Sequence, residues 1–309
     1  MIYIYKRTAE GLQKVEKIEK GCWINVVNPT NEDLGNLHVE LNIPMQFLTD
    51  PIDIDERARI EVEGNILLTI LRIPFYDKDN FDISYMTLPM GIIFTEDVAI
   101  TIFTKETETF IDFISSCLSN FSTENRSRTL LQIFFKTALL YLKYLKEINK
   151  RTSSIEKELH MSMKNEELIK LLNLEKSLVY FITSLKSNEI MMEKLERMGF
   201  LKREEDKDLL DDVIIENKQA IEMANIYSNI LSGMMDAFAS VISNNVNTVM
   251  KTLTSVTIIL MIPTLVASVY GMNVEIPYGD SHVAFLITLL LSFVLSFIGV
   301  MILKMRKWF

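Results

Sequence analysis

The sequence has few of the residues that build disulfides or metal clusters. Its only cysteines, Cys22 and Cys117, are far apart, and so are its three histidines, His38, His160 and His282. Two distant cysteines provide no disulfide framework and fit a reducing compartment. No zinc cluster can be assembled from residues spaced in this way.

Motifs for nucleotide binding and hydrolysis are also absent. The chain contains neither G-x-x-x-x-G-K-[ST] nor G-x-G-x-x-G, which argues against a nucleotide-driven pump and a dinucleotide enzyme. No Ser/His/Asp or Cys/His set has a spacing that suggests hydrolysis. The absence of these motifs leads us to expect no enzyme activity. The N-terminal stretch MIYIYKRTAEGLQKVEK lacks a basic segment followed by an apolar one, so we also expect no signal peptide.

Helix-breaking residues are scarce in the middle of the chain. No proline occurs between Pro89 and Pro263, and only Gly199 and Gly233 interrupt residues 100–262. This predicts long helices at about 127–163 and 166–198, and a third from near Lys207 that runs on into an apolar segment. The preceding part has β-rich runs at 2–6, 22–27, 59–73, 85–94 and 98–104, with short helices at 31–41 and from near Pro44. The fold class is therefore an α+β domain followed by long helices.

Two long apolar runs close the sequence. The stretch 252–274 has no charged residue, and a second apolar run covers 283–303. Each is long enough to cross a bilayer as a helix. Lys251 and the basic tail 304–309 place both termini in the cytoplasm by the positive-inside rule. The predicted organisation is a cytoplasmic α/β domain (1–125), a helical hairpin (126–206), a stalk helix (207–273) that includes span 252–273, an external loop (274–282) and span 283–303.

The net charge of −9 lies almost wholly in the soluble part. An acidic body repels nucleic acid and raises the local concentration of cations. The partners expected from charge and hydropathy are therefore cations and membrane lipid, with no nucleic acid. Solubility alone is an equally good explanation of the acidity.

The first apolar run has a polar side. A period of 3.5 residues places the following residues on one helix face: Asn247, Met250, Thr254, Thr257, Met261, Thr264, Ser268 and Gly271. Small and hydroxylated residues often pack membrane helices together, which is one interpretation. The other is a row of uncharged oxygens and thioethers along a water-filled path, which requires a ring of identical chains.

The residues Tyr270, Gly271, Met272 and Asn273 form the tetrapeptide YGMN at the end of this run, with one further span and a basic tail behind it. In this position the motif resembles that of the CorA family of magnesium and cobalt transporters. The similarity extends upstream through Ser243, Asn244, Asn247, Val249, Met250, Lys251, Leu253 and Thr254.

The resemblance implies a homopentameric, funnel-like ring in the cell membrane that takes up Mg²⁺, also Co²⁺ and Ni²⁺, by passive conduction. It implies a selectivity filter at Tyr270, Gly271, Met272 and Asn273, although Asn273 beside Gly271 is also a common helix C-cap. It implies a pore lined by Asn247, Met250, Leu253, Thr257, Met261 and Thr264. Glu275 and Asp280 would attract cations to the mouth, or would be ordinary solvated loop residues.

The resemblance further implies cytoplasmic carboxylates that bind Mg²⁺ between subunits and close the ring. Alignment with the family matches Asp212, Asp236 and, after one inserted residue, Asp50 to such positions, whereas the bland alternative is solvated charge. Two other functions stay open. One is zinc transport by the same fold, against which Met272 argues, and the other is a non-conducting, membrane-tethered helical scaffold.

Overall fold

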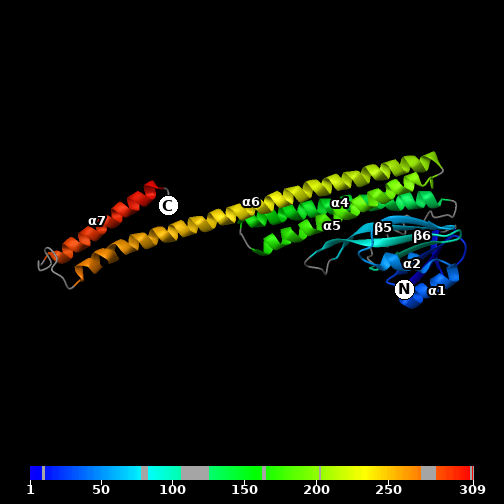
Figure 1. The fold of residues 1–309 in the computed structure, drawn as a ribbon, viewed down its shortest axis with the longest axis horizontal. Coiled ribbons are helices and arrows are strands. Elements are labelled where there is room, and N and C mark those ends of the chain that lie inside the picture. The colour runs from blue at the N-terminus through cyan, green and yellow to red at the C-terminus, as the bar shows by residue number, and fades with distance from the viewer. Residues whose placement is uncertain are drawn as a thin grey trace. The chain divides into compact units, whose positions relative to one another are not determined.

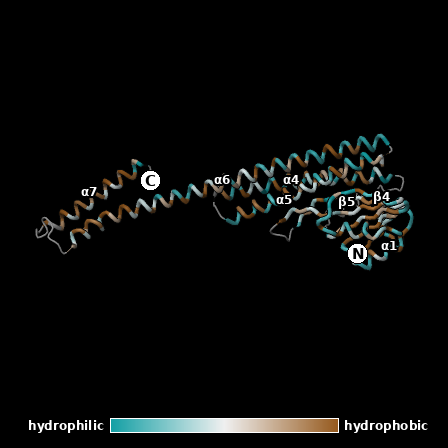
Figure 2. Tube along the Cα trace, viewed as in Figure 1, coloured by the Kyte–Doolittle hydropathy of each residue, from teal (hydrophilic) through white to brown (hydrophobic). Residues whose placement is uncertain are grey.

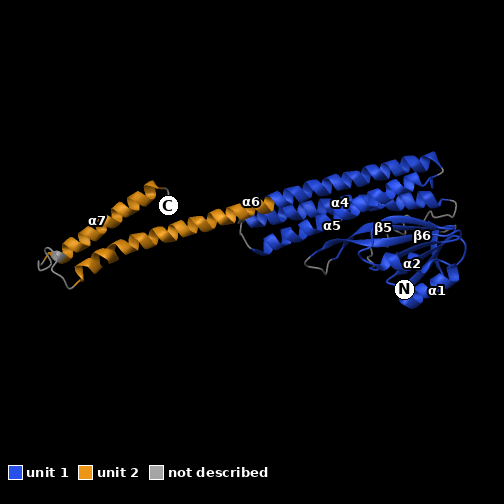
Figure 3. Ribbon diagram, in the orientation of Figure 1, with its two compact units in different colours: residues 1–233 blue, residues 234–309 orange. Residues whose placement is uncertain are grey.

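The chain folds into two compact units in a computed structural model that describes residues 1–8, 11–77, 83–105, 125–161, 165–201, 203–272, 283–306 and 308. The first unit comprises Met1–Gly233 and the second Met234–Phe309 (Figure 3). The filter residue Asn273 and the loop acids Glu275 and Asp280 lie outside the described residues.

The first unit is built on a seven-stranded mixed sheet with the order β2-β1-β3-β7-β6-β5-β4. Among the described strands only β3 and β7 pair in parallel, which the long connection between them permits. The strands are β1 (Ile2–Thr8), β2 (Gly11–Val15), β3 (Cys22–Val27), β4 (Arg59–Glu63), β5 (Ile66–Tyr76), β6 (Tyr85–Phe94) and β7 (Ala99–Phe103).

The observed strands differ from the predicted β-rich runs at two places. The run 59–73 is not one strand, because Gly64 at φ +58° turns the chain between β4 and β5, which pair antiparallel. Strand β2 was missed, since it is short and mostly exposed and therefore lacks an apolar alternation. The runs at β3 and β6 were predicted with the bounds that the structure gives.

Small helices cover one face of the sheet. They are α1 (Asn31–Leu41), α2 (Met45–Thr49) and the 3₁₀ turn η1 (Asp50–Ile52). Helix α1 begins with a capping box, in which the backbone amide of Asp33 donates to Thr30 Oγ1 at 3.2 Å and the Thr30 amide donates to Asp33 Oδ2 at 3.0 Å. The core on this face includes Ile24, Leu34 and Ile100.

Long helices cover the opposite face, as Figure 1 shows for α4 and α5. Helix α4 spans Arg126–Met161, α5 spans Asn165–Arg197, and α6 spans Glu204–Tyr270. The core here joins Trp23 and Phe94 of the sheet to Phe134, Leu195 and Val213. The long proline-free stretch thus forms long helices, and α6 begins three residues before the predicted Lys207.

Buried polar contacts fix α5 to the sheet. The side chain of Asn188 accepts from the amide of Arg72 at 3.0 Å and donates to its carbonyl oxygen at 2.8 Å, as a neighbouring strand would. The hydroxyl of Tyr141 on α4 donates to the same carbonyl at 3.0 Å. Both helices are therefore held in register with β5 by satisfied backbone groups rather than by apolar contact alone.

Candidate functional site

Within the described parts of the chain, two helices are long and apolar enough to cross a membrane. They are α6, whose C-terminal part is uncharged beyond Lys251, and α7 (Ala284–Met305). Figure 2 shows the apolar colour along most of α7 and of this part of α6. Most of their side chains are exposed in a single chain, which is the opposite of a soluble core helix.

Helix α6 turns one face toward α7. On this face Ser255 is buried and Val266 is 8% exposed. Gly299 of α7 lies against it, since a Cβ atom at that position would be 3.0 Å from Ile262 Cδ1. A residue without a side chain therefore allows the two helices to approach closely, as is usual between membrane helices.

The predicted pore residues lie on the other side of α6. At about 100° per residue, the stripe through Asn247, Thr257 and Thr264 is centred roughly opposite the face that carries Ser255 and Val266. All six pore residues are exposed: Asn247, Met250, Leu253, Thr257, Met261 and Thr264. The structure thus brings them onto one surface and leaves that surface uncovered by α7.

The two threonines of the predicted pore donate their hydroxyl protons to backbone carbonyls of α6. Thr257 Oγ1 donates to the carbonyl of Leu253 at 2.9 Å, and Thr264 Oγ1 donates to that of Leu260 at 3.0 Å. A hydroxyl has a single proton, so each oxygen can offer only lone pairs to anything beside the helix. Such an acceptor matches the outward hydrogens of water bound to a cation.

An open groove runs along part of this stripe. It has a volume of about 470 Å³, and its lining residues are Ile258, Met261, Ile262, Thr264, Leu265 and Ser268. The oxygens of Thr264 and Ser268 and the sulfur of Met261 are its polar and polarisable atoms. The sequence predicted the polar residues of this groove from their spacing.

The predicted filter begins where α6 ends. Tyr270 is the last residue of the helix, and the amide of Gly271 still donates to the carbonyl of Ala267 at 2.9 Å. A Cβ atom at position 271 would lie 3.3 Å from that carbonyl oxygen, so a glycine fits the tight helix end. Met272 follows and is 56% exposed.

The three predicted regulatory carboxylates are not brought together. Asp50 is in η1 on one face of the sheet, whereas Asp212 is exposed on α6, whose first turns pack on the other face. Asp236 is exposed in the second unit. Among the described residues, no group of three or more His, Cys, Asp or Glu side chains could hold a metal ion. A cation bound by these acids would need contacts from more than one subunit.

Asp50 has a partner that the sequence interpretation missed. Arg59 Nη2 donates to Asp50 Oδ2 at 2.5 Å, and the same guanidinium also contacts Glu56 and Glu61. The sequence did contain a signal, because Arg59 stands in a segment that has a carboxylate at positions 50, 53, 55, 56 and 61.

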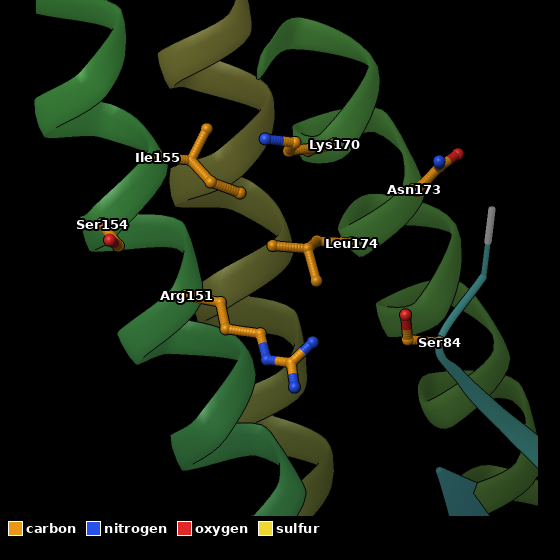
Figure 4. A pocket seen from close by; sticks show the side chains of 7 residues that line it. All are labelled: Ser84, Arg151, Ser154, Ile155, Lys170, Asn173 and Leu174. Carbon is orange, nitrogen blue, oxygen red and sulfur yellow. The ribbon is translucent and has the colours of Figure 1, made fainter. Parts of the chain in front are cut away.

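A pocket of about 260 Å³ between α4 and α5 was not predicted (Figure 4). Its lining residues are Ser84, Arg151, Ser154, Ile155, Lys170, Asn173 and Leu174. Lys170 donates to Glu167 at 2.8 Å, which raises the pKa of the ammonium, and Arg151 donates to the Tyr76 hydroxyl at 2.7 Å. The lysine charge is thus already compensated, and we assign no ligand to this pocket.

A model of the family described as CorA-like Mg²⁺ transporter protein matches residues 19–307. The chain belongs to the CorA family. This confirms the family proposed from YGMN, and it places the chain among transporters of divalent cations rather than among enzymes. The fold of mixed sheet, long helices and two apolar C-terminal helices is that of the family.

Individual CorA proteins are similar over nearly the whole chain. The cobalt/magnesium transport protein CorA of Methanocaldococcus jannaschii is 27% identical over 93% of this chain and 90% of its own length. The protein of the same name from Thermotoga maritima is 23% identical over 93% of this chain and 83% of its own. The complete structure of the M. jannaschii CorA magnesium transporter superposes with a TM-score of 0.83 at 25% identity, covering 100% of this chain and 99% of the other.

Proposed function

We propose that this CorA-family protein is a homopentameric, funnel-like ring that carries Mg²⁺, and also Co²⁺ and Ni²⁺, into the cell by passive conduction. The observation that supports it most is the stripe of uncharged oxygens and thioethers on α6, opposite the face that α7 covers. A stripe of polar groups is disfavoured against lipid, and several copies arranged around an axis would turn it toward water instead.

The proposed path handles the cation with its water. Mg²⁺ dehydrates reluctantly, so rapid passage requires groups that hold metal-bound water rather than replace it. Thr257 and Thr264 offer lone pairs for this purpose, and Asn247 adds an amide. Rings of Met250, Leu253 and Met261 would form apolar constrictions that close by losing water.

At the outer end we propose a filter formed by Tyr270, Gly271, Met272 and Asn273. One Asn273 carboxamide from each subunit would accept hydrogen bonds from the hydrated ion, and a neutral group lets the ion leave again. Tyr270 would anchor the ring at the membrane interface. Glu275 and Asp280 in the external loop would raise the cation concentration at the mouth.

The membrane potential would provide the driving force. A doubly charged ion that enters an interior-negative cell gains roughly 4.6 kcal/mol per 100 mV. In this proposal both termini lie in the cytoplasm. The chain order is a cytoplasmic α/β domain (1–125), a helical hairpin (126–206), a stalk helix with the first span (207–273), an external loop (274–282), the second span (283–303) and a basic tail (304–309). Uptake then needs no nucleotide.

We also propose that cytoplasmic Mg²⁺ closes the ring through Asp50, Asp212 and Asp236. Carboxylates that face each other across a subunit boundary repel unless a divalent cation lies between them. Loss of the ion would therefore loosen the closed arrangement, which couples cytoplasmic Mg²⁺ to the pore. The exposure of Asp212 and Asp236 in the single chain leaves both side chains accessible to a neighbouring subunit.

The test is Mg²⁺ entry into liposomes that contain the purified protein, with and without an interior-negative potential. We expect the potential to increase entry and Asn273→Ala to abolish it. The control is Asn36→Ala, which removes an exposed amide on α1. Mg²⁺ entry that survives Asn273→Ala would refute the filter, zinc entry without Mg²⁺ entry would favour the zinc transporter, and no conduction of any divalent cation would favour the scaffold.

A further inference from the structure

The segment that carries Asp50 contains its own cation. The guanidinium of Arg59 contacts a carboxylate on each of its three sides: Asp50 through Nη2 at 2.5 Å, Glu61 through Nε at 3.1 Å, and Glu56 through Nη1. Although burial acts against the charge, these hydrogen bonds and negative charges raise the pKa of Arg59 above its ordinary value. The Asp50 carboxylate is therefore already paired with a positive charge before any metal ion binds.

The backbone around Asp50 is fixed from several directions. The ring of Pro51 lies so close to Gly91 that a Cβ atom there would be 2.3 Å from Pro51 Cγ. Arg72 Nη1 donates to the carbonyls of Ile54 at 2.5 Å and Glu56 at 2.9 Å. These anchors hold the backbone of the segment, so a cation that binds Asp50 has to displace the Arg59 side chain.

The arginine is also only partly removed from water. The side chain of Arg59 is 27% exposed and that of Asp50 is 30% exposed. An ion pair at this depth is weakened by solvent, so a divalent cation can compete with it. A doubly charged ion beside Asp50 is attracted more strongly than a singly charged guanidinium, but it must first displace the guanidinium from Asp50.

We propose that Arg59 is a resident counter-ion that competes with divalent cations for Asp50. It makes Asp50 a weak ligand and raises the concentration of cytoplasmic cation needed to engage this position. This inference rests on the regulatory role proposed above for Asp50 and specifies how that role is limited in this chain. The resident guanidinium balances part of the charge of the acidic segment when little divalent cation is present.

The test measures Co²⁺ binding to the purified full-length protein in detergent by calorimetry, at constant ionic strength. Arg59→Ala should increase the apparent affinity for Co²⁺ on the order of tenfold, the size of a typical coupling between charged ligands. Arg57→Ala is the matched control, because Arg57 is exposed, lies two residues away and carries the same charge. It should leave the affinity close to that of the unmodified protein.

A double variant assigns the effect to Asp50. Asp50→Asn alone should change Co²⁺ affinity little, whereas the same substitution combined with Arg59→Ala should remove the increase. If Arg59→Ala prevents folding, as judged by circular dichroism, Arg59→Lys decides. A lysine keeps the charge but cannot hold three carboxylates at once, so a smaller increase is expected. Unchanged or weaker Co²⁺ binding in the variant that folds would overturn the proposal.

The same preparations separate this inference from the proposed function. If the unmodified protein in liposomes fails to conduct Mg²⁺, the transport proposal fails while the Co²⁺ comparison can still be read. If it conducts Mg²⁺ but Arg59→Ala and Arg57→Ala bind Co²⁺ equally, only the role of Arg59 is refuted.

Discussion

At the scale of single residues, the direction of a hydrogen bond decides what a side chain can do. Thr264 is suited to hydrated cations because its proton is committed to the carbonyl of Leu260. Thr252 makes the same bond, to the carbonyl of Thr248 at 3.0 Å, but lies about 120° away from Thr264 around the axis of α6. The two residues therefore differ in the face they occupy and not in their local chemistry.

We expect Thr264→Val to reduce Mg²⁺ entry into liposomes roughly tenfold, the effect of losing one hydrogen bond to a charged group. Valine keeps the shape of the side chain and removes the acceptor oxygen. Thr252→Val is the control and should conduct like the unmodified protein. Equal losses in the two variants would mean that the effect arises from the helix rather than from the path.

Residue-scale pairing is also where sequence interpretation failed most clearly. The sequence places Asp50 and Arg59 in one charged segment, but it does not show which carboxylates of that segment contact the guanidinium. Three carboxylates reach one guanidinium because the fold brings Asp50 of η1 and Glu56 to Arg59, which shares strand β4 with Glu61. Linear spacing holds no information about which of several nearby charges are in contact.

At the scale of helices, α6 and α7 depend on a close approach. Gly299 provides it, since no side chain lies between the α7 backbone and Ile262. Gly233, which lies in α6, offers a comparison, because no atom lies within 4 Å of a Cβ atom placed there. One glycine is required by packing and the other is not.

Gly299→Val should lower the free energy of unfolding in detergent by about 1–3 kcal/mol, because it overpacks the contact with Ile262. Gly233→Val should be neutral or stabilising, since valine has a better helix propensity than glycine. Thermal or denaturant unfolding followed by circular dichroism measures both. A second substitution, Ile262→Ala, should recover part of the loss at Gly299, and a failure to do so would argue against the contact.

The elements themselves were predicted unevenly. Long helices followed from the scarcity of proline and glycine, and α1 followed from a helix-start signature at residues 29–33, because these signals act within a few residues. The sheet order and the parallel pair of β3 with β7 join segments that are far apart in sequence. Contacts of that kind depend on packing, which no local pattern specifies.

At the scale of the whole molecule, the proposed ring couples the cytoplasmic domain to the pore. In this proposal Asp212 on α6 binds cytoplasmic Mg²⁺ at a subunit boundary. Asp212 and its neighbour Asp211 are both exposed in the single chain. Because a helix turns by about 100° per residue, the two carboxylates point in different directions. They thus separate the effect of position from the effect of net charge.

Asp212→Ala should raise, several-fold, the internal Mg²⁺ concentration that halves conduction, in keeping with typical coupling energies between sites. Asp211→Ala should leave it nearly unchanged. Electrical recording from lipid bilayers with graded internal Mg²⁺ measures this directly. Identical inhibition of the two variants and the unmodified protein would refute the sensor role of Asp212.

The sequence by itself determined the family, the two apolar spans and the polar stripe, because a helical period and a short motif are local properties of the chain. Only the tertiary structure decided which face of helix α6 is covered by α7, and that Arg59 forms an ion pair with Asp50. Both depend on contacts between residues that are separated along the chain and come together only when it folds.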